Sequence, residues 1–223
     1  MTSSGVVVIH SARLVSDGRV TEQGWVRFDG DLISAVGTGS GWQDTADLDA
    51  AELIDAEFVD AGGQWLTPGF IDIHNHGGGG AAFDGGADAI QTAMAFHTAH
   101  GSTRFVLSVV TAPLDSLEAE LRGIASLMRD EHRILGSHLE GPFLDPDHRG
   151  AHNPAFLKLA DPDAVDRLLE AADGTLRQIT IAPELPGGMD AVRRFSSAGA
   201  AVAVGHTGAD YEQTLAAFDA GAS

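Results

Sequence analysis

The spacing of apolar and polar residues changes near residue 66 of this chain. Before that point, short apolar runs are separated by turn residues, which predicts β-strands joined by tight connections. Asp29-Gly30 stands between the second and third runs and is a hairpin signal. We therefore expect a small β module over residues 1–65. Its predicted strands are Val6–Ile9, Trp25–Phe28, Leu32–Val36 and Glu57–Val59.

After this point, apolar runs alternate with amphipathic segments, a pattern typical of a parallel α/β structure. The predicted strands are Gly69–His74, Arg104–Val110, Ile134–Glu140, Gln178–Ala182 and Ala201–Gly205. The predicted helices are Ala87–His100, Leu114–Asp130, Asp163–Ala172, Met189–Ala198 and Tyr211–Ala220. Such units fit either an open doubly wound sheet or a barrel. A full (β/α)8 barrel takes about 250 residues, so the second domain, residues 66–223, has room for about five of the eight units.

Composition narrows the chemistry that the chain can support. Its formal charge of −19 argues against nucleic acid or an anionic membrane surface as a partner, because both repel an acidic protein. No long apolar run opens the chain, so we expect no signal peptide, no membrane span and a cytoplasmic protein. The chain has no cysteine. A metal site must therefore use imidazole and carboxylate ligands, which suits catalytic zinc, iron, manganese or cobalt.

Two histidines stand at the end of the first strand predicted for the second domain. Side chains alternate along a strand, so His74 and His76 are expected on the same side. Barrel active sites are built at the carboxyl ends of the strands. The glycines at positions 77–80 would let a ligand or a loop backbone approach closely. We interpret the pair as ligands of one metal ion, and the alternative is a pair of loop histidines that bind nothing.

Two further strands end in residues of the same kind. Glu140 closes its strand, where a buried carboxylate is unfavourable unless a cation or a metal ion pairs with it. His206 ends the fifth strand in the same topological position. Three predicted strands thus carry histidine or glutamate at their carboxyl ends, which lie on the same side of the sheet. This favours a shared metal site over coincidence. The predicted metal ligands are His74, His76, Glu140 and His206.

The remaining histidines give weaker signals. His138 shares a strand face with Glu140 but lies deeper, which favours a hydrogen-bonded core histidine over a ligand. In the polar loop after Glu140, Arg149 or His152 could bind hydroxyl, carbonyl or phosphate oxygens, although a solvated surface loop has the same composition. The histidines expected to be structural or solvated are His10, His97, His100 and His132.

Four segments carry a family pattern: Pro68-Gly69-Phe70-Ile71-Asp72-Ile73-His74-Asn75-His76, His138-Leu139-Glu140-Gly141-Pro142-Phe143, Gly150-Ala151-His152 and Gly205-His206-Thr207. Together they resemble the amidohydrolase superfamily and, within it, the N-acetylglucosamine-6-phosphate deacetylases. Many amidohydrolases share the first segment. The second and third segments point to the deacetylases in particular.

This resemblance implies a (β/α)8 TIM barrel, of which the first five βα units are present, with a small N-terminal β-sandwich domain. It implies that Glu140 and His206 bind metal and that Ala151 and His152 bind the substrate. Zinc is the expected ion, with Fe2+, Mn2+ or Co2+ as alternatives. The implied reaction removes the acetyl group of N-acetylglucosamine 6-phosphate, in amino-sugar catabolism and cell-wall recycling. In the implied mechanism, a bound metal ion would lower the pKa of the attacking water, and an aspartate would protonate the leaving amine.

Part of the family pattern is missing from the sequence. The sixth-strand histidine, the residues that grip the phosphate and the proton-shuttling aspartate would all lie beyond residue 223. No catalytic residue is therefore assigned, and an inactive truncated fragment is an alternative to an active enzyme. The presence of His74 and His76 makes either one or two metal ions possible. The resemblance further implies a homodimer in the full-length form.

Other branches of the superfamily remain as alternatives. Dihydroorotases and hydantoinases typically bridge two metal ions with a carboxylated lysine on the fourth strand. Lys158, the only lysine, falls in a loop or at a helix start, which counts against that branch. The open alternatives are another amidohydrolase that acts on a sugar or cyclic amide, and a non-catalytic half barrel with an unpaired edge.

Overall fold

The structure is a computed structural model that describes residues 5–44 and 56–223. The chain divides into two compact units, Met1–Pro68 and Gly69–Ser223. In the described parts of both units, no helix has the length and apolar character that crossing a bilayer requires.

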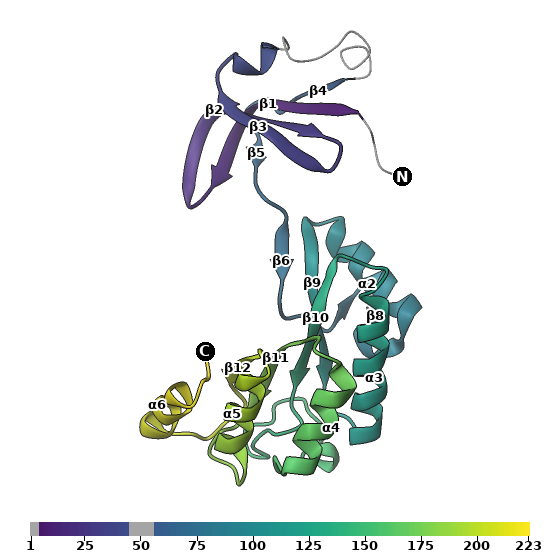
Figure 1. Cartoon of the computed structure of the whole chain (residues 1–223), viewed down its shortest axis with the longest axis vertical. Helices are drawn as coiled ribbons and strands as arrows, with labels where there is room; N and C mark the ends of the chain where they lie inside the picture. Colours follow the sequence, from purple (N-terminus) through teal and green to yellow (C-terminus); the bar gives the residue numbers. More distant parts are fainter. Residues whose placement is uncertain (1–4, 45–55) are drawn as a thin grey trace. The chain divides into compact units, whose positions relative to one another are not determined.

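The described residues of the first unit form a five-stranded sheet (Figure 1). Strands β1 (Val6–Ser16), β2 (Arg19–Asp29) and β3 (Leu32–Thr38) pair antiparallel in the order β3-β2-β1. Strands β4 (Glu57–Asp60) and β5 (Trp65–Leu66) both add to β1 in parallel. A short 3-10 helix, η1 (Gly41–Gln43), follows β3.

The first unit confirms the predicted hairpin and extends the predicted strands. Strand β2 ends at Asp29, and Gly30 has a φ of +61°, which glycine adopts without strain. Strand β1 runs well past the apolar run that predicted it, because the register shifts between Ile9 and Ala12. Such an irregularity interrupts the alternation of apolar and polar residues, so a search for that alternation ends the strand too early.

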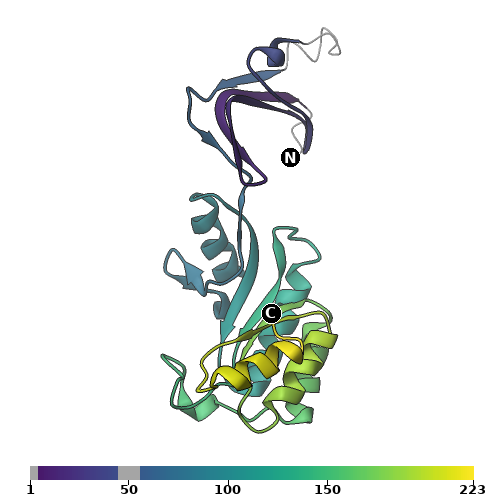
Figure 2. The same ribbon diagram turned by 90° about the vertical axis from the view of Figure 1, so that its left-hand side faces the viewer.

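The second unit contains a parallel five-stranded sheet in the order β12-β11-β10-β9-β6 (Figures 1 and 2). The strands are β6 (Phe70–Asp72), β9 (Ser102–Val110), β10 (Ile134–Glu140), β11 (Leu176–Ile181) and β12 (Ala201–Val204). The helices are α2 (Ala87–Thr98), α3 (Leu114–Leu127), α4 (Pro162–Ala172), α5 (Gly188–Ser197) and α6 (Tyr211–Asp219). Short elements are β7 (Gly77–Gly78), β8 (Ala81–Ala82), η2 (Phe83–Gly85) and η3 (Pro154–Phe156).

Apolar side chains hold the helices of this unit against its sheet. Phe105 and Leu107 of β9 and Leu139 of β10 are fully buried, as are Leu121 of α3 and Phe195 of α5. Burial of a large apolar side chain contributes roughly 1.5–3 kcal/mol, so the amphipathic faces of the helices are what fix them on the sheet. The observed helices begin and end within three residues of the predicted ranges.

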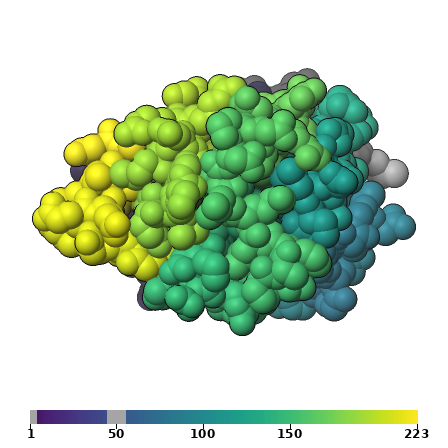
Figure 3. Space-filling view, turned by 90° about the horizontal axis from the view of Figure 1, so that it is seen from below, coloured from purple at the N-terminus to yellow at the C-terminus, as the bar shows by residue number. Residues whose placement is uncertain are grey.

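The parallel register brings the carboxyl ends of the strands to one side of the sheet. Figure 1 shows these strands running downward from the point where the chain enters β6. Figure 3 therefore views the unit from the side of the carboxyl ends, where segments coloured from teal to yellow meet. The predicted metal ligands lie at this side: Glu140 is the last residue of β10, and the histidines follow β6 and β12. Lys158 lies between η3 and α4 rather than on a strand, as predicted.

Candidate functional site

Glu140, the last residue of β10, lies at the centre of a cluster of histidines. Its side chain is 11% exposed, and its carboxylate oxygens are surrounded from several segments of the chain. Oε1 lies 3.2 Å from His206 Nε2 and 3.4 Å from His74 Nε2. Oε2 lies 2.9 Å from His76 Nε2 and 3.5 Å from His152 Nε2. The structure thus brings the four predicted ligands together, with His152 beside them.

His74 and His76 reach this cluster by a route that the sequence did not predict. Strand β6 ends at Asp72, so both histidines lie beyond the strand and its alternation does not place them. The peptide between them is held from the next strand instead, because Ser108 N–H donates to the carbonyl oxygen of Asn75 at 3.3 Å. The two Nε2 atoms are 3.3 Å apart and can therefore face one ion.

The glycines after His76 have a structural role. Gly77 and Gly78 pair with Ala82 and Ala81 as the small hairpin β7–β8. A Cβ on Gly77 would lie 2.1 Å from the carbonyl oxygen of Ala81, and the φ of Gly77 is +140°. The glycines were expected to let a ligand or a loop backbone come close. The structure shows that the backbone of Ala81 and Ala82 takes this place.

His206 is oriented by the loop that follows Glu140. Its Nδ1–H donates to the carbonyl oxygen of His148 at 3.0 Å, so Nε2 of the neutral ring carries a lone pair. That lone pair faces Glu140 Oε1 at 3.2 Å. Two lone pairs at this distance require a cation, which is either a proton or a metal ion. The donor set therefore fits a divalent metal.

His152 has the opposite tautomer and suits a different task. The backbone N–H of Thr111 points at His152 Nδ1 at 3.4 Å, which leaves the ring proton on Nε2. Nε2–H can therefore donate to an oxygen atom. Arg149 holds the loop by donating to the carbonyl oxygen of His152 at 3.0 Å. Ala151 and His152 line an open pocket of about 400 Å³ together with Glu140 and His206.

His138 is a buried structural residue that borders the cluster. Its side chain is fully buried, with Nδ1 at 2.9 Å from Ser108 Oγ and Nε2 at 2.9 Å from Thr180 Oγ1. Both ring nitrogens are thus engaged, which agrees with the expected core histidine. The ring packs edge-to-face on His74, with centroids 4.6 Å apart.

The charges of the cluster favour a bound cation. The hydrogen bond from His76, supported by His206, lowers the pKa of Glu140 to about 2. The same contact with Glu140 raises the pKa of His76. Burial lowers the pKa of His138 to about 3 and also lowers the pKa of His152. The site therefore presents a negative carboxylate among imidazoles, two of which burial keeps neutral.

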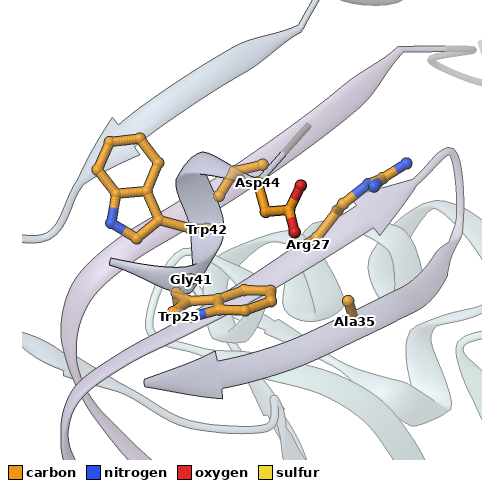
Figure 4. A pocket seen from close by; sticks show the side chains of 7 residues that line it. Trp25, Arg27, Ala35, Gly41, Trp42 and Asp44 are labelled. Atoms are coloured by element: carbon orange, nitrogen blue, oxygen red, sulfur yellow. The ribbon is translucent and has the colours of Figure 1, made fainter. Parts of the chain in front are cut away.

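The ring contacts described for His97, His100 and His10 lie outside this cluster. His97 bonds through Nε2 to the carbonyl oxygen of Gly77 at 3.0 Å, and His100 bonds through Nδ1 to that of Phe96 at 2.8 Å. His10 stacks on Trp42 with ring centroids 3.9 Å apart. A second pocket, in the first unit, contains no histidine in its lining (Figure 4). It is bordered by Val8, Trp25, Arg27, Ala35, Gly41, Trp42 and Asp44.

Two residues near the cluster, Thr111 and Glu184, were not predicted from the sequence to belong to the site. Thr111 follows β9 and donates from its hydroxyl to the carbonyl oxygen of Glu140 at 3.1 Å. Glu184 follows β11 and bonds to the turn after His206. Both stand just beyond the carboxyl end of a parallel strand. A polar residue at that position could have been predicted to lie near the site. The prediction considered only strands that end in histidine or glutamate.

Known proteins resemble this chain over most of its length. The sequence pattern of the Amidohydrolase family matches residues 65–223. The chain is 34% identical over 207 residues to an N-acetylgalactosamine-6-phosphate deacetylase of Escherichia coli O157:H7, which covers 91% of this chain and 52% of that protein. It is 34% identical over 171 residues to an N-acetylglucosamine-6-phosphate deacetylase of Vibrio furnissii, which covers 75% of this chain and 43% of that protein.

A solved structure of Mycobacterium smegmatis N-acetyl-D-glucosamine-6-phosphate deacetylase, a variant in complex with N-acetyl-D-glucosamine-6-phosphate, superposes with a TM-score of 0.84 at 38% identity. The superposition covers 98% of this chain and 54% of that one. The chain thus spans about half the length of the relatives that it matches.

Proposed function

Because this chain belongs to the amidohydrolase family, we propose that it carries the metal-binding part of an N-acetylglucosamine-6-phosphate deacetylase. The observation that supports this most is the convergence of histidine Nε2 atoms from separate segments on the carboxylate of Glu140. The relatives described above are deacetylases of phosphorylated N-acetylated amino sugars. Their names and the geometry of the cluster point to the same chemistry.

The proposed metal ligands are His74, His76, Glu140 and His206, for one or two ions. His74, His76 and Glu140 offer ligand atoms close enough for one ion, and Glu140 and His206 do so together with His152. Zinc suits an imidazole and carboxylate set, and Fe2+, Mn2+ or Co2+ are alternatives. When bound, the ion lowers the pKa of water and polarises an amide carbonyl. Glu140 supplies the negative charge that holds it, and the bond from His206 Nδ1 to His148 keeps the His206 Nε2 lone pair aimed inward.

The proposed substrate-binding residues are Ala151 and His152. His152 Nε2–H is positioned by the Thr111 amide and donates to an oxygen of the substrate. Its burial keeps the ring neutral, so the ring supplies a hydrogen bond without adding a positive charge beside the metal ligands. Ala151 lines the same pocket with a small side chain that leaves room for an acetamido sugar.

We also propose the architecture of the full-length protein. Residues 66–223 would form the first five units of a (β/α)8 barrel, and residues 1–65 part of a β-sandwich. A homodimer in the cytoplasm is the expected form. Size-exclusion chromatography with light scattering would test the dimer, and a monomer at micromolar concentration would contradict it.

The decisive experiment measures acetate release from N-acetylglucosamine 6-phosphate together with zinc content. It is run on this chain and on a longer chain that carries the remaining barrel strands. Glu140→Gln serves as the inactive variant and Glu170→Gln, an exposed residue of α4, as the matched control. We expect acetate from the longer chain and from its Glu170→Gln variant. No acetate from either zinc-loaded chain would contradict the proposal.

A second substrate is favoured by one observation. The Escherichia coli relative that matches 91% of this chain is an N-acetylgalactosamine-6-phosphate deacetylase. That sugar differs from the first only in the orientation of one hydroxyl group. Comparing kcat/KM for the two sugar phosphates would show which of them the site prefers.

A further inference from the structure

Glu184 directs its carboxylate at the turn that follows His206. It stands just beyond β11, the strand that lies between those leading to Glu140 and His206. Its Oε2 accepts from the Thr207 hydroxyl at 2.5 Å, and its Oε1 accepts from Gly208 N–H at 2.6 Å. Both oxygens are thus bonded to the two residues after His206. Hydrogen bonds to a carboxylate are about twice as strong as neutral ones.

The positive residues of the neighbouring helix pair elsewhere. On α5, Arg193 bonds to Asp190 at 2.9 Å and Arg194 bonds to Asp166 at 2.9 Å. The charge of Glu184 therefore acts on the turn rather than on these arginines.

The turn needs such support because of the conformation of His206. The φ of His206 is +51°, in the left-handed region that residues with a Cβ rarely adopt. The Thr207 hydroxyl that donates to Glu184 also accepts from Ala209 N–H at 2.9 Å. Glu184, Thr207 and Ala209 therefore form a continuous chain of hydrogen bonds around the turn. This chain restricts the backbone on the C-terminal side of His206.

Glu184 is itself held by rigid neighbours. Ala182 and Pro183 are buried, and Ala182 N–H donates to the carbonyl oxygen of Phe143 at 2.9 Å. On the other side, a Cβ on Gly188 would lie 2.6 Å from the carbonyl oxygen of Pro183, so α5 packs directly against this segment. Glu184 lies between the end of β11 and the packed start of α5, so its backbone has little freedom to move.

We propose that Glu184 is a positioning residue for His206, acting through the turn at Thr207 and Gly208. It keeps the left-handed backbone in place, so that the His206 ring points its Nε2 at Glu140. This inference rests on the proposed function, since it takes His206 as a metal ligand. The hydrogen bonds of Glu184 go to the turn, which distinguishes its role from that of a ligand.

The test compares zinc affinity, by competition with a chromophoric chelator, in Glu184→Ala, Glu184→Gln and the control Asp190→Asn. Asp190 is an exposed acidic residue of α5 whose carboxylate accepts from its neighbour Arg193. We expect Glu184→Ala to weaken zinc binding about 10- to 100-fold, the usual effect of removing an outer-shell partner. Glutamine still accepts from Gly208 N–H through its amide oxygen, so Glu184→Gln should restore most of the affinity. Asp190→Asn should bind as the unmodified chain does.

Two spectroscopic readouts separate positioning from general stability. The Co2+ absorption bands should change in Glu184→Ala and return in Glu184→Gln, at a temperature where each variant is folded. In the metal-free chain, NMR should show faster exchange of the Gly208 amide and shifted ring signals of His206 in Glu184→Ala.

The outcomes are distinguishable from those of the proposed function. Unchanged zinc affinity and Co2+ bands in Glu184→Ala would overturn the role of Glu184, and so would an equal loss in Asp190→Asn. If the unmodified chain binds no zinc, the proposed metal site fails, and the metal-free NMR still decides on Glu184. Unchanged Gly208 exchange and His206 signals would then overturn it.

Discussion

The two sides of the candidate metal centre are built differently. His74 and His76 follow a three-residue strand at the edge of the sheet, and their side chains are 44% and 39% exposed. On the other side, the His206 and His152 side chains are 28% and 5% exposed, and each is hydrogen-bonded to a main-chain group. Glu140 belongs to both sides. The side that contains His206 and His152 is thus preorganised by hydrogen bonds to the main chain, whereas His74 and His76 follow a short edge strand and are more exposed.

The surroundings of β6 explain the difference. In the described part of the chain, β6 has a strand neighbour on one side only, which is β9. Phe70, Ile71 and Ile73 are each more than half exposed. An apolar edge strand with an open side contributes little packing to hold the residues that follow it. We therefore expect the edge side to contribute less to metal affinity in this chain than the side that contains His206.

The largest expected effect comes from the residue that both sides share. Glu140→Gln removes the negative charge between the histidines, and the cluster then becomes a set of imidazoles with a weak amide ligand. We expect a loss of zinc affinity larger than the roughly 100-fold that an outer-shell change causes. Metal analysis after dialysis would measure it, and full metal content would contradict the assignment of Glu140 as a ligand.

His138→Ala should have the next largest effect, which is on the stability of the fold rather than on zinc affinity. The substitution leaves a cavity and removes the hydrogen-bond partner of the Ser108 and Thr180 hydroxyls. We therefore expect the free energy of unfolding to fall by about 3 kcal/mol. Urea unfolding would measure the change. The matched control is His132→Ala, an exposed histidine whose loss should change stability by less than about 0.5 kcal/mol. Equal unfolding midpoints for the two variants would refute a structural role for His138.

Separate substitution of the two sides tests the comparison directly. His206→Asn should weaken zinc binding more than His74→Asn does, by roughly tenfold, because the lost ligand is the preorganised one. Isothermal titration of each variant with zinc would give the ratio. If His74→Asn causes the greater loss, the edge side is the stronger half and our comparison is wrong.

The smallest effect concerns a carboxyl group of α3. Burial, together with the charge of Asp84, raises the pKa of Glu120 from 4.5 to about 7. The folded state therefore holds this proton more tightly than the unfolded state, and stability is lost as the pH rises from about 4.5 to about 7. Glu120→Gln should stabilise the chain by about 1 kcal/mol at pH 8, after allowance for solvent screening of a partly exposed group, and much less at pH 5.

Urea midpoints at the two pH values would measure this change. Glu170→Gln, at an exposed position of α4, is the control. A gain of equal size at both pH values would show that the titration of Glu120 is not the cause.

The sequence by itself determined where the helices of the second unit lie and which residue types gather at the strand ends. Both are local properties: the period of apolar residues sets which face of a helix is buried, and the parallel order of strands brings their carboxyl ends to one side. That order predicted that His74, His76, Glu140 and His206 would lie on one side of the sheet, although it did not predict the backbone beyond β6 that brings His74 and His76 there. The same reasoning found the hairpin at Asp29-Gly30, because turn chemistry is written in adjacent residues.

Only the tertiary structure decided what each polar group does. The sequence left open whether His152 binds oxygen atoms or is solvated, and the Thr111 amide decides that its Nε2 carries the proton. His138 was expected to be a hydrogen-bonded core histidine, but its two hydroxyl partners lie on other strands. Glu184 gains its role from bonds to residues more than twenty positions away. The placement of His76 depends on irregular backbone beyond β6, held by the Ser108 N–H, which the alternation rule could not describe. These outcomes depend on hydrogen bonds between distant segments, and no local periodicity encodes them.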